Sequence, residues 1–173
     1  MTSPSTTMNR DEKAERRSIS DITIVREYLH PRRKVWRALV DPELVARWLM
    51  RPEGLEPVVG TRFRLVAKPQ PGWRGFVECE VLEAEFERRL RWSWVGNEGQ
   101  APMEVTFTLE DIPGGTRLTF THTGFSGVGG FLLAKLMMGP GWRKMFTRLV
   151  PRLLEDLDEH GALRPDSTIA PKF

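Results

Sequence analysis

The sequence contains a single cysteine, Cys79, among its 173 residues. One thiol excludes an internal disulfide framework and a cysteine-rich zinc site. Histidine is also scarce, and His30, His122 and His160 lie too far apart to show the spacing of a metal-binding motif. We therefore expect neither a metal ion nor a cofactor.

Long apolar runs are missing as well. No stretch reaches the roughly 18 uncharged apolar residues of a membrane-spanning helix, and the polar N-terminus lacks the apolar segment of a secretory signal. We expect a cytoplasmic protein without a membrane span. The net charge is only +3, from 26 Lys and Arg against 23 Asp and Glu. So small a charge predicts no nucleic-acid partner and no basic binding face.

The apolar residues that are present concentrate in one central segment. Residues 1–20 are rich in Ser, Thr, Arg and Glu, and residues 162–173 hold two prolines and few apolar residues. Both ends are predicted to be flexible tails. The remaining segment, 21–161, has the length of one domain. The composition, 40% hydrophobic and 28% charged, is that of a soluble globular protein.

Hydrophobic spacing predicts the order of the elements in this domain. A strand at 21–29 precedes two short helices, at 31–40 and from Pro42 onward, with Asp41 as the cap of the second. About five strands follow between residues 62 and 123, joined by turns such as Pro113-Gly114-Gly115. Both alternation phases occur around Glu78 and Glu80, which predicts a β-bulge near residues 80–82 with these carboxylates facing solvent.

The last part of the domain is predicted to be helical. Residues 131–138 form an apolar helical piece that Gly139-Pro140-Gly141 interrupts. We expect Pro151 to kink the helix that follows and Gly161 to cap it. The strongest periodic signal in the chain is the apolar stripe of this helix, made by Trp142, Met145, Phe146, Leu149, Val150, Leu153, Leu154 and Leu157.

These elements predict an α+β fold. Strands in an uninterrupted meander pair antiparallel, and a helix with one long apolar stripe buries that stripe against the sheet. The expected architecture is a curved antiparallel sheet of about six strands around a long C-terminal helix. A cavity between sheet and helix is the candidate ligand site.

Several segments carry a resemblance to a known family. They are 31–48 (PRRKVWRALVDPELVARW), 74–94 with its central VLEAEFERRLRWSW, 115–125 (GTRLTFTHTGF) and the Gly141-Trp142 pair. The chain resembles START-related proteins of the SRPBCC superfamily, in the branch of the C-terminal domain of the activator of the ninety-kilodalton heat-shock-protein ATPase. The resemblance covers residues 20–160 and implies a helix-grip fold. Residues 126–141 depart from the family pattern by being glycine-rich and apolar, and we interpret them as a lid or a dimer contact.

Within this fold we predict the residues that line the cavity. Tryptophans of the short helices and of the strand around Trp92 can present both an apolar ring and an N–H group to a ligand, although each can also be ordinary core. The predicted lining consists of Trp36, Trp48, Phe63, Trp92, Phe107, Phe120, His122, Met145 and Phe146, and the predicted gate of Phe131, Leu132 and Leu136.

The polar candidates leave two interpretations open. His122 shares a strand face with Phe120, so it either contacts a ligand, as an orienting or acid–base group, or is a core histidine bonded to the backbone. Ser126 lies in a loose likeness of a nucleophile elbow, but no acid–histidine pair accompanies it, and a strand-to-helix turn is the better interpretation.

Three functions remain as hypotheses. The first is binding of a small hydrophobic, aromatic or lipid-like molecule, and we expect binding rather than catalysis. The family resemblance implies two alternatives: a chaperone-regulating interaction module that acts in the stress response, and a cyclase- or aromatase-like enzyme that uses His122. A homodimer through residues 126–141 is a further expectation.

Overall fold

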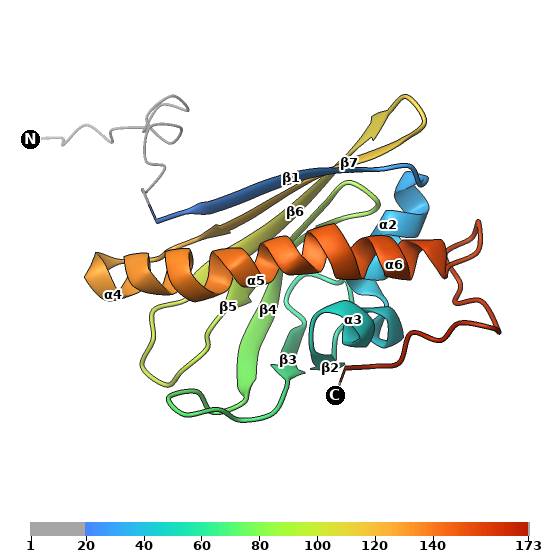
Figure 1. Ribbon diagram of the computed structural model, residues 1–173. Coiled ribbons are helices and arrows are strands. Elements are labelled where there is room, and N and C mark those ends of the chain that lie inside the picture. Colours follow the sequence, from blue (N-terminus) through green and yellow to red (C-terminus); the bar gives the residue numbers. More distant parts are fainter. Residues whose placement is uncertain (1–19, 173) are drawn as a thin grey trace, which may run out of the picture.

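A computed structural model describes residues 20–172 as a seven-stranded antiparallel sheet curved along one long helix (Figure 1). The strand order is β1-β7-β6-β5-β4-β3-β2. The predicted α+β helix-grip fold is therefore confirmed. The predicted N-terminal tail, apart from Ser20, lies outside the described residues.

The elements before the long helix follow the predicted order. β1 is followed by two short helices, of which α3 begins where the Asp41 side chain accepts a hydrogen bond from the Glu43 N–H at 3.0 Å. The sequence did not predict β2, a three-residue edge strand. The bounds are β1 (Ile22–Tyr28), α2 (Arg32–Val40), α3 (Pro42–Trp48), β2 (Arg51–Glu53), β3 (Arg62–Val66), β4 (Phe76–Glu85), β5 (Arg89–Trp94), β6 (Met103–Ile112) and β7 (Gly115–Thr123).

Strand alternation divides the sheet into two chemically different faces. Along β6 and β7, every second side chain is buried toward the helix, among them Phe107, Phe120 and His122. The predicted bulge is present, because the register of β4 against β5 shifts between Val81 and Glu83. The inner face is thus apolar and the outer face polar, as the alternation predicted.

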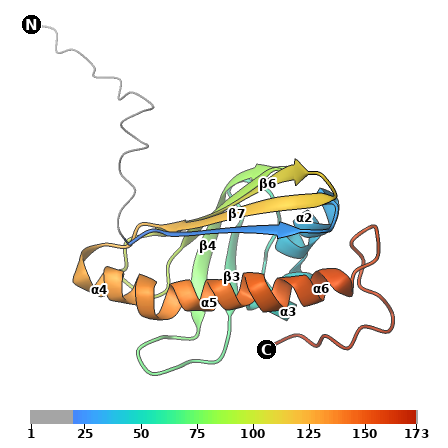
Figure 2. The ribbon, with the colours of Figure 1, turned by 45° about the horizontal axis from the view of Figure 1, so that its top comes forward.

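The long helix runs without a break from residue 127 to residue 155, and Figures 1 and 2 show it lengthwise along one face of the sheet. The predicted interruption at residues 139–141 is wrong, whereas the helix continues past Pro151 as predicted. The helix contains two π-helical stretches. Its segments are α4 (Gly127–Leu132), η1 (Leu133–Met138), α5 (Gly139–Lys144), η2 (Met145–Leu149) and α6 (Val150–Glu155).

Each π stretch ends two residues before a proline, and this explains why the helix is continuous. Proline lacks an N–H and clashes with the carbonyl four residues earlier in an α-helix. Here the residue before each proline donates five residues back, Gly139 to Ala134 and Val150 to Met145. The wider turn accommodates each proline ring, so the helix axis continues.

The second proline leaves the Phe146 carbonyl without a donor from the helix. The Val150 N–H donates to the Met145 carbonyl, and Pro151 has no N–H, so neither can donate to the Phe146 carbonyl. The buried Tyr28 hydroxyl donates to it at 2.8 Å, and burial raises the pKa of this phenol. The end of β1 is thereby joined to the middle of the helix.

The chain after the helix returns over α3. The helix ends at Glu155 and not at the predicted Gly161, which instead has a left-handed φ of 81° in a following turn. The Lys172 N–H donates to the Ala46 carbonyl at 3.0 Å, and Arg47 Nε donates to the Ile169 carbonyl at 3.0 Å. The flexibility of residues 162–173 stays a prediction.

Candidate functional site

The space between the sheet and the helix is occupied by a connected set of aromatic rings. Trp92 contacts Phe63 and Phe107, with ring centroids 5.2 and 5.1 Å apart. Phe107 contacts Phe120 at 5.3 Å, and Phe120 contacts Phe146 at 5.0 Å. Four strands and the helix therefore bring these rings together in the core.

The other predicted lining residues take different places. Trp48 joins the ring set through Phe146, with centroids 5.6 Å apart, and Met145 is partly buried beside it. Trp36 is buried on α2, and its ring neighbour is Phe86, at 6.0 Å. Trp36 therefore belongs to the core without contacting the central rings.

Two tryptophans outside the predicted lining belong to the ring set. Trp142 stacks on Phe146, with an interplanar angle of 13°, and lies 4.4 Å from Phe120 between ring centroids. Trp94 contacts both Trp142 and His122. Two sequence signals could have identified them: the position of Trp142 on the helical stripe, and that of Trp94 two residues after Trp92.

His122 is fully buried in this aromatic environment. Trp142 Nε1–H, which can only donate, donates to His122 Nδ1 over 3.1 Å. Burial lowers the pKa of His122 to about 3, so the ring is neutral at pH 7. Since Nδ1 accepts, the single proton of the neutral ring lies on Nε2. His122 is thus a core histidine, but its partner is the Trp142 side chain and not the predicted backbone carbonyl.

His122 Nε2–H is a buried donor that has no partner among residues 20–172. The indole Nε1–H of Trp92 is a second such donor. Trp92 pairs with Val105 and Val105 with His122, so the two side chains flank Val105 in one row across β5, β6 and β7. By contrast, Trp48 Nε1–H donates to the Ala38 carbonyl at 2.8 Å. Three arginine Nε atoms of the described chain, those of Arg26, Arg32 and Arg91, are also buried without a hydrogen bond, but each of these guanidinium groups is bonded through another nitrogen. His122 and Trp92 have no second donor. Buried polar groups are nearly always paired, so these two orphaned donors in the aromatic interior require an explanation.

The predicted gate residues lie on the outer side of the long helix. Phe131, Leu132 and Leu136 are 38%, 47% and 70% exposed. Ala134 is the buried position of this part of the helix. Ser126 and Gly127 form the strand-to-helix turn, and Gly127 has a left-handed φ of 66°. The gating role itself stays a prediction.

Two open grooves lie at the surface of the described residues. The larger, of about 580 Å³, follows the outer face of β3, β4 and β5. The smaller, of about 370 Å³, runs between β1 and the helix, beside Tyr28 and Pro151. Phe63 and Phe146 are the two predicted lining residues that also reach a groove.

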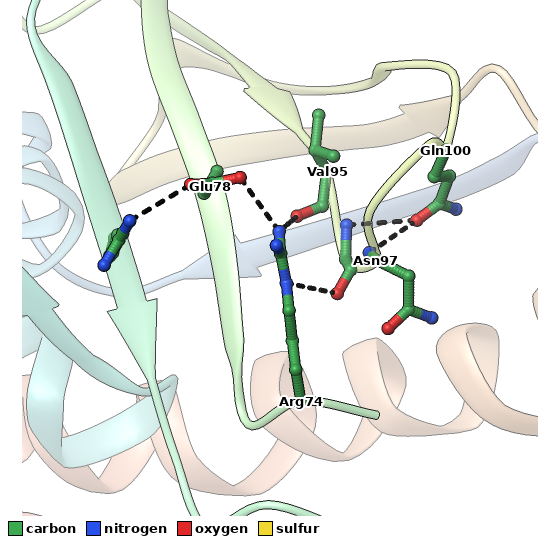
Figure 3. Close-up of polar contacts among 7 residues, drawn as sticks. Arg74, Glu78, Val95, Asn97 and Gln100 are labelled. Carbon is green, nitrogen blue, oxygen red and sulfur yellow. Dashed lines mark hydrogen bonds and ion pairs between the residues drawn. The ribbon is translucent and has the colours of Figure 1, made fainter. Parts of the chain in front are cut away.

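The polar side chains of the larger groove pair with one another. Glu78 accepts from Arg64 at 3.2 Å and from Arg74 at 2.9 Å (Figure 3). These bonds, that of Arg74 first, hold the pKa of Glu78 below its usual value. Figure 3 also shows the Gln100 side chain accepting from two backbone N–H groups of the neighbouring loop. The charged side chains of this groove are therefore already paired with one another and are not free to bind a ligand.

Within residues 20–172 no group of three or more His, Cys, Asp or Glu side chains could hold a metal ion. No helix of the described chain is long and apolar enough to cross a membrane.

The sequence of the domain matches a known family. The Activator of Hsp90 ATPase homolog 1-like protein family matches residues 29–153, which is most of the chain. The chain belongs to this family. No curated protein has a matching sequence.

Several solved structures are similar to this chain over most of its length. Protein MLL2253 from Mesorhizobium loti is 32% identical, with a TM-score of 0.70 over 80% of this chain and 98% of that one. CalU16 from Micromonospora echinospora is 29% identical, with a TM-score of 0.62 over 84% and 77%. DynU16, a protein of the dynemicin biosynthetic locus, is 25% identical, with a TM-score of 0.66 over 80% of this chain and 48% of that one. These similarities place the family member within the START-related SRPBCC fold.

Proposed function

We propose that the protein binds a small, largely apolar molecule that carries a hydrogen-bond acceptor, within the aromatic interior between the sheet and the long helix. The acceptor, a carbonyl or ether oxygen, accepts a hydrogen bond from His122 Nε2–H or from Trp92 Nε1–H. The rings around these donors provide the apolar contact.

The two orphaned donors carry this proposal. A buried donor left unpaired costs about 1–3 kcal/mol, and the core contains two of them in one row, although Trp48 and Trp142 have their N–H groups satisfied. A ligand acceptor removes that cost only when the ligand is bound. The position of DynU16 in a biosynthetic locus also favours a small molecule as the ligand.

Binding requires the rings to separate, because they contact one another in the structure. The first half of the long helix is best placed to move, since Ala134 is the buried residue of α4 and η1. We therefore keep Phe131, Leu132 and Leu136 as the gate. The glycines at the start of α4 lower the cost of bending there.

The same geometry argues for binding rather than acid–base catalysis. A general base near pH 7 needs a pKa close to the working pH. Burial lowers the pKa of His122 to about 3, and its only lone-pair nitrogen already accepts from Trp142. His122 therefore acts as a neutral donor, and the cyclase-like alternative loses its base.

Matched pairs of apolar compounds, with and without a carbonyl, test the proposal. Fluorenone against fluorene, and benzophenone against diphenylmethane, differ in the acceptor alone. We expect the carbonyl member of a pair to raise the melting temperature more, because only it pairs the buried donors. Equal shifts from both members, or no shift from any pair, would contradict the proposal.

Two substitutions locate the binding. Trp92→Phe keeps an aromatic ring but removes the orphaned donor, so it should weaken fluorenone binding roughly tenfold. Trp48→Phe is the control, because its N–H is already bonded to Ala38. Equal losses in both variants would argue against a role of the Trp92 donor.

The chaperone-regulating alternative rests on the description of the family. Co-purification with Hsp90 and stimulation of its ATPase would support it. Neither result is expected if the interior is a small-molecule site.

A further inference from the structure

The outer surface of the long helix combines two features that point to a second partner. Ten large apolar side chains are exposed in the described chain, and five of them lie between residues 128 and 137. They are Val128, Phe131, Leu132, Leu136 and Met137. A cluster of this kind on a soluble domain marks an interaction site.

The second half of the same surface is basic. The outward positions of the helix recur every four residues, and the first three are Val128, Leu132 and Leu136. After Pro140 the recurring positions are Lys144, Arg148 and Arg152, all exposed. One continuous outer stripe therefore passes from apolar to positively charged along the helix that Figures 1 and 2 display.

Acidic residues are absent from this part of the chain. No Asp or Glu occurs between residues 112 and 154. Among residues 20–172, Lys135, Arg143, Lys144 and Arg148 form no ion pair, whereas the arginines of the outer sheet face pair with glutamates. The small net charge, which predicted no basic face, thus conceals a segregation of charge along one helix.

We propose that this outer stripe docks on an anionic lipid bilayer. The apolar half enters the boundary between headgroups and acyl chains, and the basic half contacts lipid phosphates, as in interfacial amphipathic helices. The protein would lie on the membrane and not cross it. This proposal does not depend on the ligand of the interior.

Charge favours a membrane over a second copy of the chain. A two-fold interface places the same surface on both partners. Two such stripes would bring unpaired cations of one sign together, or set cations against apolar side chains. An anionic bilayer presents acyl chains and phosphates to the two halves at once.

Vesicle flotation tests the docking. We expect the full chain to bind vesicles of phosphatidylcholine with phosphatidylglycerol at least roughly tenfold better than vesicles of phosphatidylcholine alone. Leu132→Ser/Leu136→Ser should reduce binding to the anionic vesicles roughly tenfold or more. Lys144→Gln/Arg148→Gln should do the same and weaken the dependence of binding on salt.

Matched controls come from other exposed positions. Val58→Ser/Val59→Ser removes two exposed apolar side chains outside the stripe. Arg51→Gln/Arg62→Gln removes two exposed charges that are paired with Glu53 and Glu80. Both controls should bind anionic vesicles like the unchanged chain. Circular dichroism melts confirm that each variant is folded.

Several outcomes would overturn the docking proposal. They are no binding to anionic vesicles, equal binding to neutral ones, or equal losses in the stripe and control variants. A dimer in light scattering that Leu132→Ser/Leu136→Ser converts to a monomer, without vesicle binding, would make the surface a contact between copies. Trp92→Phe should leave vesicle binding unchanged, so failure of the interior site and failure of docking are distinguishable.

Discussion

The polar side chains on the two faces of the sheet differ in their hydrogen-bond and ion-pair partners. On the outer face, Arg62 pairs with Glu80, and Arg64 with Glu78, over 3.2 Å each. On the inner face, the aromatic rings surround His122 and Trp92, which each keep an orphaned donor. The same strands supply both faces, since their side chains alternate.

The ion pairs of the outer face and the orphaned donors of the inner face therefore have different expected roles. The outer pairs bear on stability, and the inner donors bear on the proposed ligand. Exposed ion pairs contribute little to stability, and their charges satisfy one another without a ligand. The orphaned donors lie where an unpaired group costs most. The proposed ligand site therefore lies on the inner face, and the following predictions probe the two faces in turn.

The largest effect is expected from the centre of the inner face. Phe107→Ala should lower the free energy of unfolding by about 3–5 kcal/mol, because it removes a fully buried ring and leaves a cavity. Thr106→Ala, one residue away on the outer face, should cost less than about 1 kcal/mol. Urea unfolding of both variants gives the comparison, and equal costs would contradict the assignment of faces.

The second effect is a loss of stability in acid. The pKa of His122 is about 6.5 in the unfolded chain, and burial lowers it to about 3 in the folded one. Between these values the unfolded state binds more protons, so the free energy of unfolding falls as the pH drops. The slope is up to about 1.4 kcal/mol per pH unit, or roughly 3 kcal/mol by pH 4.5.

Urea unfolding between pH 7 and pH 4.5 measures this loss. His122→Gln lacks the titrating ring but retains an acceptor for Trp142, and its stability should depend less on pH. His30, whose pKa is also lowered by burial, is unchanged in both proteins and cancels in the comparison. Parallel pH profiles would show that His122 is not buried in its neutral form.

A third effect compares two buried tryptophans. Trp48→Phe loses indole volume and also leaves the Ala38 carbonyl without its donor. Trp92→Phe loses the same volume but removes a donor that has no partner. We expect Trp48→Phe to be the more destabilising by about 1–2 kcal/mol in urea unfolding without ligand. A larger cost for Trp92→Phe would mean that its N–H is satisfied in solution.

The smallest effect belongs to the outer face. Arg64→Gln breaks the pair with Glu78, in which both side chains are about half exposed, and Glu78 retains Arg74. The expected loss is the smallest of the four and should shrink at high salt. Urea unfolding at low and high ionic strength checks this, and a loss as large as that of Trp48→Phe would show that the outer pairs are structural.

Much of the fold could be predicted because its signals are local. Alternation in β6 and β7 and the stripe from Trp142 to Leu157 each depend on spacing along one element. The continuity of the helix could not be predicted in this way. It depends on the π turns before Pro140 and Pro151 and on the hydroxyl of Tyr28, which lies more than a hundred residues from the helix in the sequence. The short edge strand β2, with Pro52 at its centre, has no period to detect.

The candidate site was predictable to a similar degree. Face alternation placed Trp92, Phe107, Phe120 and His122 in the interior. It could not show that Trp142 Nε1 meets His122 Nδ1, since that depends on how the helix sits over the sheet. Which donors remain orphaned follows from that packing and not from spacing.

The most direct test of the central claim observes the donors themselves. In a ¹H–¹⁵N spectrum, the indole signal of Trp92 is identified by its absence in Trp92→Phe. On titration with fluorenone, we predict that the Trp92 signal shifts while that of Trp48, bonded to Ala38, stays in place. If fluorenone binds and the Trp92 and His122 signals do not move, or if only the partly buried Trp73 responds, the interior donors are not the ligand site.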